Sequence, residues 1–394
     1  MQRMLDSLTI QELLAEPWIQ QNTAIGDTVR WAVETVRENR EQPLYKDRYQ
    51  PIVSGQPAEH AHPFLSIIMR TQLKRPDALT EVLLSLSAQS SQDFEVVLIP
   101  HRVSPATLQA VRDLVRGFGD GFASKVRILP LDEGNRTAPL NFGFAHSWGD
   151  YVSVLDDDDL VMEHWVSEFQ KAAAEEPGTV LHCYAVAQDW SLVASQGGPD
   201  ALCAVSKPRA EYCKPFSSLV ELRINRCPVF SLAFPGYAFK ELGFLFDESL
   251  STTEDWDFLR RVTAFCGVTD IPRVGGIYRL WRDRNTSHKV HGQAEWKRNY
   301  QRITAKEQSY PVILRRSQLQ EGLALSRMIE GVRDDEDESG GLTQEERTIR
   351  DLKSIVAAQR ETIAALEKKS WTGRTVGMLR LIYHRALGRQ EEGD

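Results

Sequence analysis

The sequence has no long hydrophobic run and no pattern of paired cysteines. No stretch approaches the ~18 uncharged apolar residues that a transmembrane helix needs, and acids interrupt residues 1–18, where a signal peptide needs an unbroken apolar core. The five cysteines are odd in number and form no C-x-x-C pair, so we expect neither a disulfide framework nor a structural zinc site. These absences predict a soluble protein of a reducing compartment, the cytoplasm.

The sequence also has no excess of positive charge, and it lacks the glycine-rich phosphate-binding motifs. The 47 Lys and Arg against 55 Asp and Glu give a net charge of −8, which disfavours a nucleic acid partner. No G-x-G-x-x-G follows a predicted strand and no G-x-x-x-x-G-K-[ST] is present, which disfavours dinucleotide oxidoreductases and P-loop enzymes. The remaining composition, 42% hydrophobic and 26% charged over 394 residues, is that of a globular protein with about two or three structural units.

Short apolar runs alternate with amphipathic stretches from residue 64 onward. The apolar runs cover 64–69, 94–99, 126–131 and 151–155. The amphipathic stretches between them cover 77–90, 104–118 and 137–148. This alternation predicts an α/β fold with a mostly parallel sheet buried on both faces by helices. Because such sheets bind ligands beyond the carboxyl ends of their strands, the residues that follow each run are the first candidates for a site.

Four consecutive aspartates, Asp156 to Asp159, follow the last of these runs. Adjacent carboxylates repel one another unless a cation or hydrogen-bond donors compensate them. One interpretation is a divalent metal site, because carboxylate oxygens suit Mg²⁺ or Mn²⁺ and such an ion can bridge to substrate phosphates. The other is a solvated acidic loop, or a cap for a helix starting near Val161.

A second acidic pair, Glu254 and Asp255, precedes Trp256 about a hundred residues downstream. As a catalytic element, one carboxylate would take a proton from an attacking hydroxyl while the other orients the nucleophile. As a structural element, the pair would be the acidic first turn of a helix through Trp256–Val262, stabilised by the helix dipole. The residues alone leave both interpretations open.

An ordered set of motifs across roughly 64–290 resembles the family 2 glycosyltransferases of GT-A fold. The motifs are HPFLSIIMRTQLKRPDALTEVLLSLSAQSSQDFEVVLI, Gly134–Gly143, Gly149–Tyr151, Leu155–Asp159, Phe246–Leu250, Glu254–Arg261, and Tyr278-Arg279 followed by Ser287-His288. The resemblance implies an inverting, metal-dependent transferase that moves a sugar from a nucleotide-diphosphate donor to a hydroxyl acceptor, with Mg²⁺ or Mn²⁺ as cofactor. A glycan or lipid-linked glycan acceptor in bacterial polysaccharide or glycoconjugate biosynthesis is the family expectation.

The resemblance also implies roles for individual residues. Asp158 and Asp156 look like the metal-binding D-x-D pair, with Asp159 supporting them and His288, or less favourably His291, completing the metal sphere. A loop histidine without a ligand role fits His288 equally well. The implied donor-binding residues are Thr71, Arg136, Asn141, Asp156 and Asp157, and the implied catalytic residues are Asp255, as general base, and Glu254, supporting acceptor or donor hydroxyls.

Two positions depart from the family pattern. Residues 99–104 lack the aspartate that commonly contacts the nucleotide base, and Arg70 stands where a proline is usual. Base recognition is therefore expected to differ, and a uridine donor is not assumed. The missing aspartate also keeps open a catalytically degenerate glycan-binding or scaffold protein. A sugar nucleotidyltransferase is disfavoured, because that class normally carries a glycine-rich loop after its first strand and residues 70–74 contain no glycine.

The predicted organisation has four parts. Residues 1–63 form an N-terminal helical extension to about residue 40, followed by an irregular proline-containing linker over 41–63. Residues 64–310 form a GT-A catalytic domain, with a nucleotide-binding half (64–160) and an acceptor half (161–310) of helices and loops. A helix and acidic linker follow over 311–341, and a coiled-coil and basic amphipathic tail over 342–394.

The C-terminal tail suggests partners. Heptad spacing over 342–369 fits a homodimer seam. The basic amphipathic segment 371–389 fits peripheral contact with the inner face of the cell membrane, or equally a helix packed on the catalytic domain or on a second copy.

Overall fold

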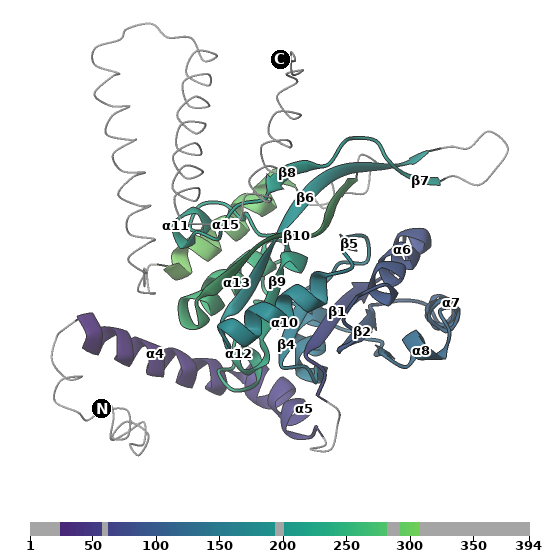
Figure 1. Cartoon of the computed structure of the whole chain (residues 1–394). Coiled ribbons are helices and arrows are strands. Elements are labelled where there is room, and N and C mark those ends of the chain that lie inside the picture. Colours follow the sequence, from purple (N-terminus) through teal and green to yellow (C-terminus); the bar gives the residue numbers. More distant parts are fainter. Residues whose placement is uncertain (1–23, 57–61, 194–200, 282–291, 308–394) are drawn as a thin grey trace, which may run out of the picture. The chain divides into compact units, whose positions relative to one another are not determined.

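The computed structural model describes residues 24–56, 62–193, 201–281 and 292–307 (Figure 1). The expectations for residues 1–23, for His288 and His291, and for 311–394 lie outside this part of the chain. Within it, no helix is both long enough and apolar enough to span a bilayer.

The first half of the sheet is parallel, as the alternation predicted. Its neighbouring strands run in the order β3-β2-β1-β4, and each pairs with the next in parallel. The strands are β1 (Leu65–Thr71), β2 (Phe94–Pro100), β3 (Val126–Ile128) and β4 (Tyr151–Val154). The connecting helices are α6 (Pro76–Ser87), α7 (Pro105–Arg116), α8 (Asp120–Ala123) and α9 (Ala138–His146). The predicted α/β class with a mostly parallel sheet flanked by helices is confirmed.

The two faces of β1 explain its apolar run, which Ser66 alone interrupts. Leu65, Ile67 and Met69 pack into one hydrophobic core with α6 and α7, while Ile68 packs into a second core with α9. All four side chains are fully buried, because helices cover both faces of the sheet.

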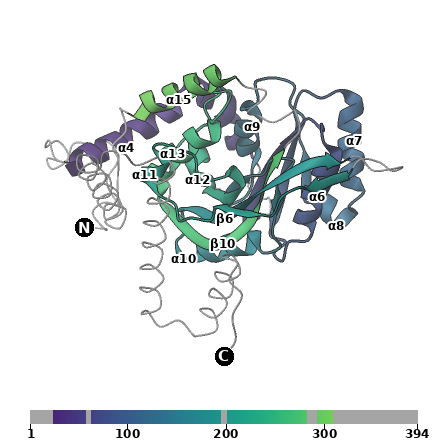
Figure 2. The same ribbon diagram turned by 90° about the horizontal axis from the view of Figure 1, so that it is seen from above.

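The second half of the sheet corrects the prediction of helices and loops beyond residue 160. Two 14-residue strands, β6 (Val180–Val193) and β10 (Val268–Trp281), run side by side in parallel (Figures 1 and 2). Their sequences hide this, because β6 carries buried polar residues that have partners, and β10 contains a proline, two adjacent glycines and irregular register. The other elements are β5 (Leu160–Val161), α10 (Trp165–Glu175), β7 (Ala201–Ala204), β8 (Arg209–Tyr212), α11 (Ser218–Glu221), η2 (Val229–Ser231), β9 (Leu232–Pro235), α12 (Gly236–Lys240), α13 (Glu254–Cys266) and α15 (Gln293–Glu307).

The aspartate run is held between two strands rather than capping a helix. β5 pairs antiparallel with β10 directly after the run, so the helix expected near Val161 is wrong; α10 begins at Trp165. The pairing depends on Gly276, where a Cβ would come within 2.4 Å of the Leu160 carbonyl oxygen.

The predicted irregular linker is helical as far as Ser54. After α4 (Ala24–Glu41), the chain continues as η1 (Leu44–Tyr49) and α5 (Gln50–Ser54). Proline is tolerated here because Pro43 and Pro51 stand at helix starts, where no intrahelical N–H is needed. Tyr45 and Tyr49 are 1% and 0% exposed, so the segment contributes these two side chains to the hydrophobic core.

Tyr49 ties this segment to the loop before α13. Its hydroxyl donates to Glu248 Oε1 over 2.6 Å. Tyr49→Phe leaves that buried bond unmade and is expected to lower the free energy of unfolding by about 1–3 kcal/mol, measured by urea denaturation. Tyr300→Phe, at a side chain that is 41% exposed, is the matched control and should change little. Equal losses in the two variants would contradict the role of Tyr49.

Candidate active site

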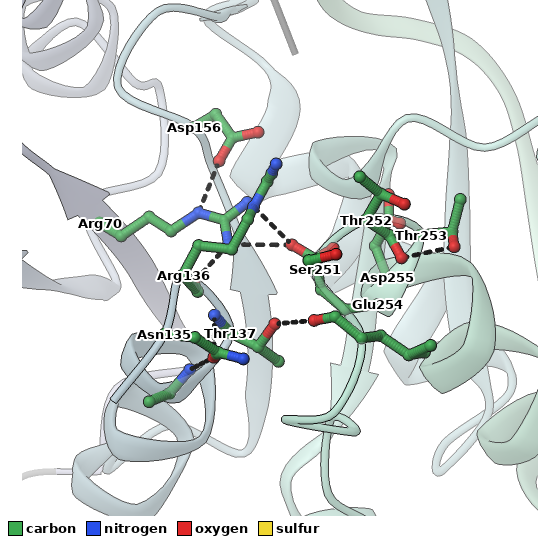
Figure 3. A network of polar contacts seen from close by, with 12 residues as sticks. Arg70, Asn135, Arg136, Thr137, Asp156, Ser251, Thr252, Thr253, Glu254 and Asp255 are labelled. Atoms are coloured by element: carbon green, nitrogen blue, oxygen red, sulfur yellow. Dashed lines mark hydrogen bonds and ion pairs between the residues drawn. The ribbon is translucent and has the colours of Figure 1, made fainter. Parts of the chain in front are cut away.

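The candidate site lies at the carboxyl ends of β1 and β4. Arg70 and Thr71 end β1, and Asp156 to Asp159 follow β4, which pairs with β1. The second acidic pair begins α13, and Figure 3 shows it facing these strand ends across Arg70 and Arg136. The structure therefore brings together two acidic motifs that lie about a hundred residues apart in sequence.

Arg70 connects the two motifs. Its Nη1 lies 3.0 Å from Glu254 Oε1, and its Nε lies 3.4 Å from Asp156 Oδ1. The same Nη1 donates to the Arg136 carbonyl oxygen over 2.7 Å (Figure 3). Burial opposes the charge on Arg70, but Asp156 and Glu254 outweigh it and raise the pKa of the guanidinium. Arg70 is thus a partly buried cation shared by both motifs.

Glu254 forms ion pairs with two arginines through its Oε1 atom. Its carboxylate is 3% exposed, and its Oε1 contacts Arg70 and, at 3.4 Å, Arg136 Nε. Burial works against the charged form, yet Arg136 and Arg70 lower the pKa of Glu254 below its usual value. Glu254 Oε1 thus pairs with two arginine side chains.

Asp255 has a different environment from its neighbour. Its Oδ1 accepts the Trp256 N–H over 2.8 Å, and its Oδ2 accepts from Asn225 Nδ2 over 3.4 Å. Burial first, and Glu254 second, raise the pKa of Asp255 to about 6. The helix that the acidic pair would begin is confirmed, since α13 spans Glu254–Cys266. The two neighbouring carboxylates thus have opposite pKa shifts, downward for Glu254 and upward for Asp255.

Each of the four aspartates has a protein donor. Asp156 faces Arg70, and Asp157 accepts from the Thr71 hydroxyl over 2.5 Å. Asp158 Oδ2 lies 2.9 Å from Arg75 Nη1. Asp159, which is 1% exposed, accepts the Arg279 N–H over 2.8 Å and so anchors the run to β10.

The run is nevertheless crowded with negative charge. Burial, followed by Asp157 and Asp156, raises the pKa of Asp158 to about 7, and burial with Asp158 and Asp156 raises that of Asp159. Across the described residues, no group of three His, Cys, Asp or Glu side chains is arranged to hold a metal ion. The donor chemistry still fits Mg²⁺ or Mn²⁺, because Asp156 and Asp158 offer carboxylate oxygens on partly exposed side chains and such ions are often held by one or two carboxylates plus substrate phosphates.

Asn141 lies apart from these charges. It is fully buried; its Nδ2 donates to the Phe246 carbonyl oxygen and to Glu248 Oε1, both over 2.9 Å, and its Oδ1 accepts the Phe246 N–H. Its amide therefore braces the loop before α13 and does not face the predicted diphosphate or sugar.

Three non-glycine residues with positive φ border the site. Leu73 follows β1, Arg102 follows β2, and Thr253 directly precedes the acidic pair, with φ values of 52°, 53° and 61°. Such conformations are sterically unfavourable, most of all for β-branched threonine, and they concentrate at functional sites. Their position agrees with a site at this edge of the sheet.

Sequence reasoning missed the roles of Arg70 and Arg75. The sequence identifies Arg70 only as a departure from a family pattern, and it does not single out Arg75, which directly precedes α6. Both follow or end β1, at the same edge as the aspartates. A basic residue near one strand end, opposite an acidic run at the neighbouring end, is the signal that could have paired them.

Comparisons with known proteins agree with the resemblance. Residues 66–200 match the family model described as Glycosyl transferase family 2, which confirms the resemblance to family 2 glycosyltransferases of GT-A fold. One similar solved structure is S. aureus TarS 1-349, with 18% identity and a TM-score of 0.42 over 55% of this chain and 60% of that chain. The same protein in complex with UDP-GlcNAc has 16% identity and a TM-score of 0.47 over 64% of this chain and 69% of that chain. GalNAc-T7 with UDP, GalNAc and Mn²⁺ has 16% identity and a TM-score of 0.43 over 62% of this chain and 48% of that chain. The first of these matches spans less than two thirds of the TarS chain. A search of the curated proteins finds no match.

Proposed function

We propose, since residues 66–200 match Glycosyl transferase family 2, that this protein is an inverting glycosyltransferase. It would move a sugar from a nucleotide-diphosphate donor to a hydroxyl group of an acceptor. The observation that carries the proposal is the meeting of two acidic motifs around Arg70 at the carboxyl ends of parallel strands. A glycan or lipid-linked glycan acceptor and a bacterial polysaccharide or glycoconjugate pathway are proposed on the family resemblance alone.

Asp255 is the proposed general base. It would take the proton from the acceptor hydroxyl as that hydroxyl attacks the anomeric carbon from the face opposite the leaving diphosphate. The raised pKa of Asp255 suits this task, because a base acts best when its pKa lies near the working pH. Attack from the opposite face inverts the configuration of the sugar.

The arginines are proposed to receive the departing diphosphate. Arg70 and Arg136 are held in place by Glu254, so their orientation is fixed before substrate arrives. Guanidinium groups fixed in this way stabilise charge that develops on phosphate oxygens in the transition state. Asp156 and Asp158 would hold Mg²⁺ or Mn²⁺, which when bound supplies further neutralisation of the leaving group.

The proposed base sets an expected pH dependence. Asp255 must be charged to accept a proton, so kcat/KM should fall about tenfold per pH unit below pH 6, the region of its raised pKa. The charged groups that act on it are Glu254, Asp156, Arg136, Arg70 and Glu221. An initial-rate profile between pH 4.5 and 8 measures this, and an acid limb at the ordinary aspartate pKa of about 4 would contradict it.

Nucleotide binding tests the proposal most directly. A ligand that binds only the folded state raises the thermal midpoint by mass action. We expect one of UDP, GDP, dTDP and CDP, with Mn²⁺, to raise the midpoint of the wild type, and the Mn²⁺-dependent part to vanish in Asp158→Ala. No shift with any nucleotide would count against a transferase and favour a degenerate glycan-binding or scaffold protein.

A further inference from the structure

Arg75 forms an ion pair with Asp158, the carboxylate that the proposed function assigns to a metal ion. The side chain leaves the chain just before α6, and its Nη1 lies 2.9 Å from Asp158 Oδ2. The same guanidinium lies over the ring of Trp281 at the end of β10, 4.3 Å from the ring centroid. Arg75 therefore has two different partners, one acidic and one aromatic.

A divalent ion and a guanidinium compete for such an oxygen. Two positive charges a few ångströms apart repel strongly in a partly buried site, and the side chains of Arg75 and Asp158 are only 28% and 21% exposed. The face of Trp281 attracts a cation without needing the carboxylate. Arg75 can thus give up Asp158 and still keep a favourable contact.

We propose that Arg75 is a built-in competitor for the metal site, paired with Asp158 until a divalent ion displaces it from that carboxylate and leaves it over Trp281. This inference rests on the proposed function, because it concerns the same metal site. While the ion is absent, the Arg75–Asp158 pair compensates one of four adjacent carboxylates. The pair then weakens the affinity of the free protein for the ion.

Direct ion binding tests the competition without an activity assay. Electron paramagnetic resonance of free Mn²⁺ gives the affinity of the full-length wild type, Arg75→Gln and Arg48→Gln. Arg48 is the matched control, because its guanidinium also pairs with a carboxylate at 2.8 Å, that of Glu133, and also lies over an aromatic ring, that of Tyr49. We expect Arg75→Gln to bind Mn²⁺ about tenfold more tightly, a difference of about 1.4 kcal/mol, and Arg48→Gln to bind as the wild type does.

The outcomes separate this inference from the proposed function. Unchanged or weaker Mn²⁺ binding by Arg75→Gln overturns the competition, and so does an equal gain in Arg48→Gln. If Asp158→Asn binds Mn²⁺ as tightly as the wild type, the ion lies elsewhere, and the competition fails together with the proposed metal site. Nucleotide-dependent thermal stabilisation of Arg75→Gln, measured alongside, reports on the transferase proposal by itself.

Discussion

Replacing Asp255 with asparagine is expected to lower kcat by about 100- to 10,000-fold, the range that loss of a general base produces. Asparagine keeps the size of the side chain and can still accept the Trp256 N–H, but it cannot take a proton from the acceptor. Donor binding should persist, because the arginines and aspartates at the strand ends are untouched. Steady-state transfer rates and nucleotide-induced thermal stabilisation measure the two properties separately.

The control for Asp255 is a carboxylate outside the site. Asp113→Asn on α7 removes a charge from an exposed side chain that pairs with its neighbours Arg116 and Gln109, and it should leave kcat unchanged. Near-normal turnover by Asp255→Asn would make the base assignment wrong. Loss of nucleotide binding together with turnover would place Asp255 in donor recognition instead.

Arg70→Gln is expected to lower the free energy of unfolding by about 1–3 kcal/mol, because the buried Glu254 carboxylate loses one of its two arginine partners. Glu254, which is 3% exposed, would keep its charge while losing its closest cation, and Asp156 would lose its partner as well. Transfer should also be abolished, since the variant removes a cation from beside the proposed diphosphate site. Urea denaturation and transfer assays measure the two effects.

A double variant separates the stability effect from the catalytic one. Arg70→Gln with Glu254→Gln leaves fewer uncompensated charges, so it should recover most of the lost stability without recovering transfer. Arg116→Gln, in an exposed pair with Asp113, should change stability by no more than about 0.5 kcal/mol. If Arg70→Gln is no less stable than Arg116→Gln, the account of Arg70 as a partly buried cation shared by both motifs fails.

The sequence predicts the parallel half of the sheet because burial there is simple. β1 and β2 lie between helix layers, so each contains an apolar run that stands out, Ile67–Met69 in β1 and Val96–Pro100 in β2. β6 is less visible because its buried His182 and Asp189 are compensated by Asp270 and Arg209, partners that only the folded chain supplies. A polar residue in a strand thus conceals the strand when its partner is distant in sequence.

The same limit applies to the site. The acidic motifs are local, so the sequence predicts them and the helix start at Glu254. What fixes their chemistry is not local: Glu254 and Asp255 are neighbours with opposite pKa shifts, because Arg70 and Arg136 contact only the first. Asn141 shows the converse, since its motif position is clear but its amide is committed to Phe246 and Glu248.

The helical segment around Tyr49 has a consequence for synthesis on the ribosome. Tyr49 and its acceptor Glu248 are 199 residues apart. At about 5–20 residues per second, the partner emerges roughly 10–40 s after the tyrosine. During that time Tyr45 and Tyr49 lack part of the core that buries them, because Phe239, which packs against both, is also made late. The nascent chain therefore presents an aromatic segment to chaperones until the loop before α13 has been made.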